Sequence, residues 1–119
     1  MTLFNCKTQQ LNKSDKTVIG KFVGKGKSNV TIELTLSENN KFKFWAKVNS
    51  LSFDFTEGIW EKRNDTLILN SKVLNDNEGL NYALSSANWI EFKNSKWKMK
   101  STELIRIPDK KWKMKKIAE

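Results

Sequence analysis

Hydrophobic residues alternate with polar ones almost without interruption from Val18 to Ile117. Side chains on a β-strand point to opposite faces in turn, so a period of two is typical of strands with one buried face. Turn-forming residues separate the alternating runs at short intervals, as consecutive antiparallel hairpins require. The sequence therefore predicts an all-β fold, an antiparallel meander barrel of roughly eight to ten short strands, because closure removes unpaired edges.

The length of the chain fits one domain. Its 119 residues are enough for a single hydrophobic core, since domains typically run to about 100–150 residues. We expect residues 17–119 to form a single β-barrel domain. Residues 1–16 are mostly polar and are predicted to be an N-terminal tether ahead of it.

One hairpin has a register that its hydrophobic pattern fixes. A three-residue loop that ends at Asn40 pairs Leu36 with Phe42 and Leu34 with Phe44, so that every apolar side chain lies on one face. A two-residue loop would set a lysine opposite Leu36, because a shift of one residue reverses every side chain. The longer loop is therefore predicted, with Asn40 in the left-handed conformation.

The following strand contains two competing phases. A turn at residues 49–50 gives a register that directs Phe53 and Phe55 into the barrel. Trp60, which we also expect inside, is out of phase with Phe55. A β-bulge near Gly58 is predicted to bring the two parts of the strand into phase, because glycine tolerates the distortion.

Further hairpin pairings follow from the same alternation. Turns are predicted at residues 62–65, 94–95 and 108–111. They set opposite one another Trp60 and Leu67, Ile90 and Met99, Phe92 and Trp97, Ile105 and Met114, and Ile107 and Trp112. Residues 70–88 are rich in Asn and Ser, and one short strand around residues 80–84 is expected there.

The residue types exclude most catalytic and metal chemistry. The chain has 1 Cys and no His, which removes an internal disulfide, the commonest general base and the commonest transition-metal ligand. The glycine-rich stretch at residues 24–28 lacks the first glycine of a phosphate-binding loop and is interpreted as a hairpin turn. We expect the protein not to be an enzyme, with no catalytic residue, metal site or cofactor.

The positive charge is concentrated near the C-terminus. The formal net charge is +9, and the pattern Lys-Trp-Lys-Met-Lys occurs at residues 96–100 and again at 111–115. Alternation sends Trp and Met to one face and the lysines to the other, which disfavours a nucleic-acid surface in which bases stack beside the lysines. A weaker alternative is contact with nucleic acid or another anionic surface through the outward residues Lys98, Lys100, Arg106, Lys113 and Lys115.

A family resemblance rests on two motifs around the predicted turn at residues 62–65. Gly58-Ile59-Trp60 precedes this turn, and Asp65-Thr66-Leu67-Ile68-Leu69 follows it. This order resembles the lipocalin-like small barrel domains of bacterial envelope proteins. The resemblance implies a meander β-barrel, often behind a lipid-anchored cysteine, of generally unassigned role.

The leading functional hypothesis is a non-enzymatic lipocalin-like module that binds a small hydrophobic molecule inside the barrel. The residues predicted to converge there are Phe44, Phe53, Phe55, Trp60, Leu67, Trp97 and Met99. Whether they line a cavity or fill the interior stays open, because eight strands allow either. The alternative is a structural or protein-partner module of the cell envelope with a filled core, which contacts its partner through the outward Trp45 and the basic C-terminal face. Two interpretations of Trp45 stay open: an exposed contact, or a side chain that residues 70–88 cover.

The single cysteine bears on location. Leu3 precedes Cys6 by three residues and the polar tether follows it, an order that resembles the processing site of bacterial lipoproteins. In that case Cys6 carries a lipid anchor and the protein belongs to the cell envelope, provided that the natural chain starts upstream of Met1. The alternative is a free cysteine in a cytoplasmic protein.

Overall fold

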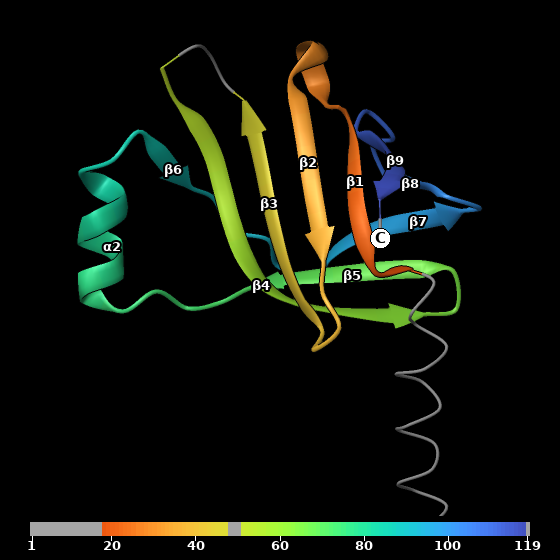
Figure 1. The fold of residues 1–119 in the computed structure, drawn as a ribbon, viewed down its shortest axis with the longest axis horizontal. Helices are drawn as coiled ribbons and strands as arrows, with labels where there is room; N and C mark the ends of the chain where they lie inside the picture. Colours follow the sequence, from red (N-terminus) through yellow and green to blue (C-terminus); the bar gives the residue numbers. More distant parts are fainter. Residues whose placement is uncertain (1–17, 48–50, 119) are drawn as a thin grey trace, which may run out of the picture.

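A computed structural model describes residues 18–47 and 51–118 of the chain. Most of these residues lie in β-strands, joined by short loops, one α-helix and a short 3-10 turn (Figure 1). The strands are β1 (Gly20–Lys25), β2 (Thr31–Leu36), β3 (Lys41–Lys47), β4 (Phe53–Arg63), β5 (Thr66–Ser71), β6 (Ala87–Trp89), β7 (Ser95–Lys100), β8 (Glu103–Ile107) and β9 (Lys113–Ala118). The 3-10 turn η2 spans Lys27–Asn29, and the helix α2 spans Asp76–Ala83.

Eight of these strands close into a barrel in which all neighbours are antiparallel. Strands β1 to β5 follow one another around it, then β7, β8 and β9, and β9 pairs with β1 to close it. The remaining strand, β6, lies outside this circle and pairs in parallel with the start of β4. It stands with α2 on the left of Figure 1. The all-β barrel expected from the alternation is confirmed.

The hairpin of β2 and β3 has the predicted register. Leu36 lies opposite Phe42 and Leu34 opposite Phe44, and Asn40 has a φ of 61°. All four apolar side chains are buried. The glycine-rich stretch at residues 24–28 also forms the expected connection between β1 and β2.

Strand β4 has a single phase, and the predicted register with β3 is wrong by one residue. Thr56 lies opposite Phe44 inside the barrel, and Phe55 lies opposite Trp45 on the outer face. The Thr56 side chain is fully buried and its hydroxyl is hydrogen-bonded to that of Ser71, which offsets the cost of burying it. Phe53 and Phe55 therefore point out of the barrel, and β4 pairs with β3 and β5 without the bulge that we expected near residue 58.

The turn between β4 and β5 is tighter than predicted. Trp60 lies opposite Leu69, and Leu67 lies opposite Lys62, so the loop contains only Asn64 and Asp65. The error is two residues, which leaves each side chain on its predicted face because the period of a strand is two. Trp60 and Leu67 are buried, as expected.

Residues 70–88 hold a helix where we expected a short strand. Asn75 accepts a hydrogen bond from the backbone N–H of Glu78, and the Glu78 carboxylate accepts one from the N–H of Asn75. This reciprocal capping box satisfies N–H groups at the start of α2. The capping box between Asn75 and Glu78 therefore favours a helix over the strand that the alternation at residues 80–84 predicts.

The hairpin predicted across residues 94–95 does not form. Residues 90–94 have no regular structure, and β7 pairs with β5 and β8 instead. The carbonyl of Phe92 accepts a hydrogen bond from the N–H of Ser71, 2.9 Å away. Phe92 is nevertheless buried, because this segment crosses from β6 into the core.

The pairing of β8 with β9 also differs by one residue. Leu104, not Ile105, lies opposite Met114, and the backbone N–H of Arg106 donates to the carbonyl of Trp112. Leu104 and Arg106 therefore share the inner phase of β8. Ile105 lies on the outer face. The prediction placed it inside because β8 has apolar residues in both phases, Leu104 in one and Ile105 in the other.

The barrel is filled by one cluster of buried apolar side chains. Its members are Val18, Phe22, Ile32, Leu34, Leu36, Phe42, Phe44, Ala46, Trp60, Leu67, Leu69, Phe92, Trp97, Leu104 and Met114. Glycine allows the strands around this core to approach closely where the barrel closes. A Cβ on Gly24 would lie 1.8 Å from the carbonyl oxygen of Lys113, so a larger residue would force β1 and β9 apart.

Candidate functional site

The interior residues predicted to bind a ligand form a packed core. Phe44, Leu67 and Trp97 have exposed fractions of 0 %, and Trp60 has 3 %. A side chain without any solvent-exposed surface lines no cavity that could hold even a water molecule. Met99 is half-buried and packs against the same core. These five residues come together inside the barrel.

The other two predicted ligand residues lie on the outside, beside Trp45. Trp45 faces outward, as expected from its position between lysines. A groove of about 500 Å³, here called the outer aromatic groove, is lined by Trp45, Lys47, Leu51, Ser52, Phe53, Phe55 and Ser86. Phe53 is 36 % exposed. The groove combines three aromatic side chains from the facing strands β3 and β4 with one lysine.

Rings from the segment after β5 support this groove from behind. The ring of Phe55 stacks on Tyr82 of α2 with centroids 6.1 Å apart, and it meets the edge of Trp89 of β6 at 6.2 Å. Tyr82 and Trp89 are 5.0 Å apart. Burial raises the pKa of the Tyr82 hydroxyl above its ordinary value. Sequence reasoning missed Tyr82 and Trp89, because neither α2 nor β6, which carry them, was predicted.

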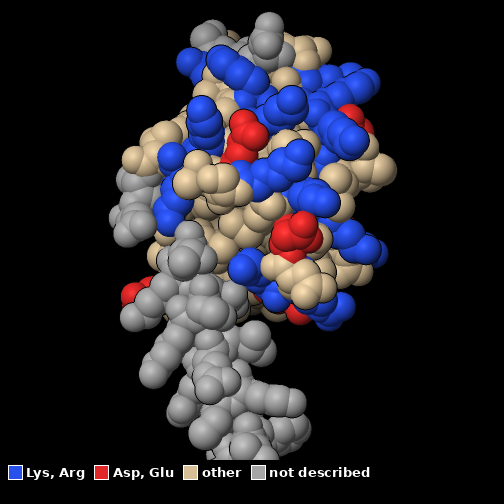
Figure 2. Space-filling model, turned by 90° about the vertical axis from the view of Figure 1, so that its right-hand side faces the viewer, with Lys and Arg blue, Asp and Glu red and all other residues tan. Residues whose placement is uncertain are grey.

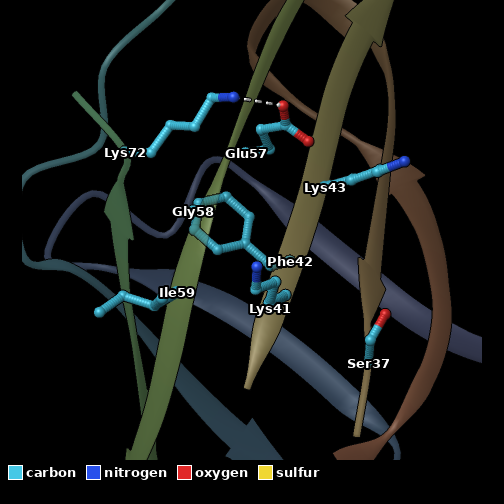
Figure 3. Close-up of a pocket in the computed structure, with 8 residues that line it drawn as sticks. All are labelled: Ser37, Lys41, Phe42, Lys43, Glu57, Gly58, Ile59 and Lys72. Atoms are coloured by element: carbon cyan, nitrogen blue, oxygen red, sulfur yellow. Dashed lines mark ion pairs between the residues drawn. The ribbon is translucent and has the colours of Figure 1, made fainter. Parts of the chain in front are cut away.

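A second groove, of about 370 Å³, lies on the outside of β3 and β4 (Figure 3). Lys72 at its rim lies 3.1 Å from the Glu57 carboxylate and 2.7 Å from that of Glu78. The hydrogen bonds to Glu78 and then to Glu57 raise the pKa of Lys72 to about 12. Lys72 in turn lowers the pKa of Glu78, as does the hydrogen bond from the Asn75 backbone. This ion-pair cluster links α2 to the barrel.

The predicted basic surface is present on the outside of β7, β9 and β1 (Figure 2). We call lysine face the residues Lys25, Lys96, Lys98, Lys100, Lys113 and Lys115. The register sets Lys98 and Lys113 on either side of Ile105, with Lys25 beyond Lys113. Glu103 occupies the corresponding place between Lys100 and Lys115.

Most of the lysine face lacks partners of opposite charge. Lys98 lies 3.6 Å from Asp65, and Lys25 donates a hydrogen bond to the hydroxyl of Thr31. Among the residues that the structure describes, the others make no ion pair. Four of the five predicted surface-contact residues thus share one face: Lys98, Lys100, Lys113 and Lys115.

The fifth predicted surface residue, Arg106, is directed inward. Its guanidinium carbon lies 5.5 Å from the ring centroid of Trp112, 5.7 Å from that of Phe92 and 5.9 Å from that of Trp97. These distances are within the range of cation–π attraction. We call this group of four residues the arginine cage. The prediction of an outward Arg106 is wrong because it followed from the wrong phase of β8.

The described part of the chain has neither a cluster of metal ligands nor a membrane-spanning helix. In residues 18–47 and 51–118 no three His, Cys, Asp or Glu side chains gather where they could hold a metal ion. No helix in these ranges is long and apolar enough to cross a membrane. Cys6 and the tether predicted at residues 1–16 lie outside the described residues, as does the turn at residues 49–50.

Comparison of the chain with protein families, with curated proteins and with solved structures finds no match. Function must therefore be inferred from the closed barrel, the outer aromatic groove, the lysine face and the arginine cage.

Proposed function

We propose that this protein is a non-enzymatic binding module that takes a small hydrophobic molecule on the outside of its barrel, in the outer aromatic groove. One observation carries the proposal. Phe53 and Phe55 leave the interior and, with Trp45, line a groove of about 500 Å³, whereas Phe44 and Trp97 inside the barrel have no exposed surface. Sites for small molecules typically have volumes of about 300–1,000 Å³ and mainly apolar linings.

The lining indicates the chemistry of the ligand. Trp45, Phe53 and Phe55 offer ring faces and edges, which favour a planar apolar molecule. Among the described residues that line the groove, Lys47 is the one that carries a charge. A ligand with an apolar body and one acidic group complements this arrangement.

The experiment is a titration with anilinonaphthalene sulfonate, a fluorescent probe that is aromatic, apolar and anionic. We expect one saturable binding event in the folded protein. Trp45→Ala should weaken it about tenfold, since an aromatic contact contributes about 0.5–1.5 kcal/mol beyond the area it buries. Lys47→Gln should weaken binding of the anionic probe and leave binding of an uncharged naphthalene analogue unchanged.

Val73→Ala is the matched control, because Val73 is 92 % exposed and lies outside the groove. Equal probe binding by Trp45→Ala, Val73→Ala and the unaltered protein would rule out this groove as the site.

A second candidate function, docking on an anionic membrane surface, rests on the lysine face. The half-buried outer residue Ile105 of β8 lies between Lys98 of β7 and Lys113 of β9, and the half-buried Ile107 lies opposite Lys96 of β7. Each lysine near an anionic lipid surface contributes about 1 kcal/mol, and apolar residues between them can enter the interface. The face includes no aromatic residue for base stacking, which favours a membrane over single-stranded nucleic acid.

Sedimentation with vesicles of phosphatidylglycerol and phosphatidylcholine tests this second candidate. We expect binding that falls steeply with salt and that is lost when Lys98, Lys100, Lys113 and Lys115 are all changed to Gln. The matched control changes four other exposed or half-exposed lysines, Lys41, Lys43, Lys62 and Lys93, and so has the same net charge. Equal loss in both variants, or binding of a single-stranded oligonucleotide but not of vesicles, would overturn membrane docking.

A further inference from the structure

Arg106 occupies an unusual position for a charged residue. It belongs to the inner phase of β8, next to Trp97 of β7 and Trp112 before β9. Its side chain is half-buried, close to where β8 leaves the barrel for the turn at residues 108–111. Phe92 completes the arginine cage from the irregular segment after β6. Three separate parts of the chain thus place rings around one guanidinium group.

The rings hold the charge but do not use its hydrogen-bond donors. Cation–π contacts engage the guanidinium through electrostatic attraction to ring faces. Its five N–H donors lie in the guanidinium plane and remain available for oxygen acceptors. The aromatic contacts therefore hold the Arg106 side chain in place but leave its N–H donors without hydrogen-bond acceptors.

The described part of the protein supplies no acceptor for these donors. The Arg106 side chain makes neither a hydrogen bond nor an ion pair there, and only its backbone N–H and carbonyl are bonded, to Trp112 and Lys110. Every buried side-chain nitrogen in the same residues has a partner. The unpartnered donors of Arg106 must therefore reach solvent at the surface of the cage.

The solvent-facing donor edge of Arg106 has no counter-charge among the described residues, and an anion there would replace water with charge-assisted hydrogen bonds. A planar carboxylate matches the guanidinium with two parallel N–H···O bonds. The surrounding rings favour a carboxylate attached to an apolar body over a strongly hydrated ion. We propose that the arginine cage is a binding site for the carboxylate group of a small organic acid, separate from the outer aromatic groove.

The test uses the full chain and benzoate as the probe, with inorganic phosphate in a second series. Binding is followed by the NMR signals of the Arg106 side-chain N–H and of the indole N–H groups of Trp97 and Trp112. Benzoate should shift these signals saturably. Arg106→Lys should weaken binding by about tenfold or more, because an ammonium keeps the charge and loses the planar pair of donors. Arg106→Met should abolish it.

Arg63 provides the matched control, because it is the other arginine and its exposed side chain pairs with Glu61 at 3.2 Å. Arg63→Met should bind benzoate like the unaltered protein, and so should Trp45→Ala, which separates this site from the outer aromatic groove. The absence of a saturable shift in the unaltered protein would overturn the proposal even if Arg106→Met failed to fold. Phosphate binding without benzoate binding would overturn the carboxylate assignment.

Discussion

Phe55 lies opposite Trp45 on the outer face of the barrel, while Thr56, the next residue along β4, lies opposite Phe44 inside it. The phase of β4 places Phe53 and Phe55 in the outer aromatic groove, and it places Thr56 and Trp60 in the core. Had β4 taken the other phase, Phe53 and Phe55 would have crowded an interior that is already filled. On the outer face the Phe55 ring packs against Tyr82 and Trp89, so that part of it is shielded from water.

The two faces of this sheet predict different stability effects. Phe44→Ala should lower the free energy of unfolding by about 3–5 kcal/mol, because it leaves a cavity in a close-packed core. Phe53→Ala should cost under about 1.5 kcal/mol, because the side chain that it shortens already meets solvent. Denaturant unfolding of both variants measures the difference. Equal losses would mean that the β4 phase is wrong.

The buried Thr56 should be coupled to Ser71. Their hydroxyl groups share a hydrogen bond, and the Ser71 oxygen also accepts from the backbone N–H of Phe92 at 2.8 Å. Thr56→Val should therefore destabilise the protein by about 1–3 kcal/mol, since it removes one partner of a buried pair and adds no cavity. A double-mutant cycle with Ser71→Ala should give a coupling of at least about 0.5 kcal/mol. Simple additivity of the two changes would argue against the bond.

The ion-pair cluster at Lys72 predicts how attachment of α2 depends on pH. Because the pKa of Glu78 is lowered from 4.5, its contribution is present above that value and is lost as the pH falls through the folded-state pKa. Because the pKa of Lys72 is raised to about 12, its contribution is full below 10.5 and is lost as the pH rises through about 12.

An NMR titration of the Glu78 carboxyl carbon measures this effect. The group should titrate below 4.5 in the unaltered protein and closer to 4.5 in Lys72→Met. The control is Lys21→Met, which removes the 3.3 Å ion pair to Glu33 on the barrel and should leave Glu78 unchanged. Unchanged titration of Glu78 in Lys72→Met would contradict the cluster.

Loss of the capping box should loosen the support of the outer aromatic groove. Asn75→Ala should destabilise α2 by about 1 kcal/mol, because it removes the acceptor of the Glu78 N–H. Hydrogen exchange of the amides in α2 should then speed up, while that of the barrel strands should not. Asn77→Ala, at an exposed position within the helix, is the control. Since Tyr82 packs on Phe55, Asn75→Ala should also weaken binding of the fluorescent probe to the outer aromatic groove.

The register between β2 and β3 could be predicted from the sequence, because only one register buries all of their apolar side chains. In β2 and β3 a shift of one residue would expose four large apolar side chains, so the pattern around Leu36 and Phe42 leaves no choice. The signal for α2, an Asn three residues before a Glu, is present in the sequence at Asn75 and Glu78. The prediction followed instead the apolar alternation at residues 80–84, which is too short to distinguish a strand from a helix.

The sequence by itself determined that this chain is an all-β barrel of short hairpins, that Trp45 faces outward, and that Trp60 and Trp97 face the core. These properties follow from alternation within single strands, which is a local signal. Only the tertiary structure decided the phases of β4 and β8, and with them the outer aromatic groove and the arginine cage. Both strands carry apolar residues in both phases, so their own pattern does not choose between faces. The choice depends on partners distant in the chain, Tyr82 and Trp89 for Phe55, and Phe92 and Trp112 for Arg106.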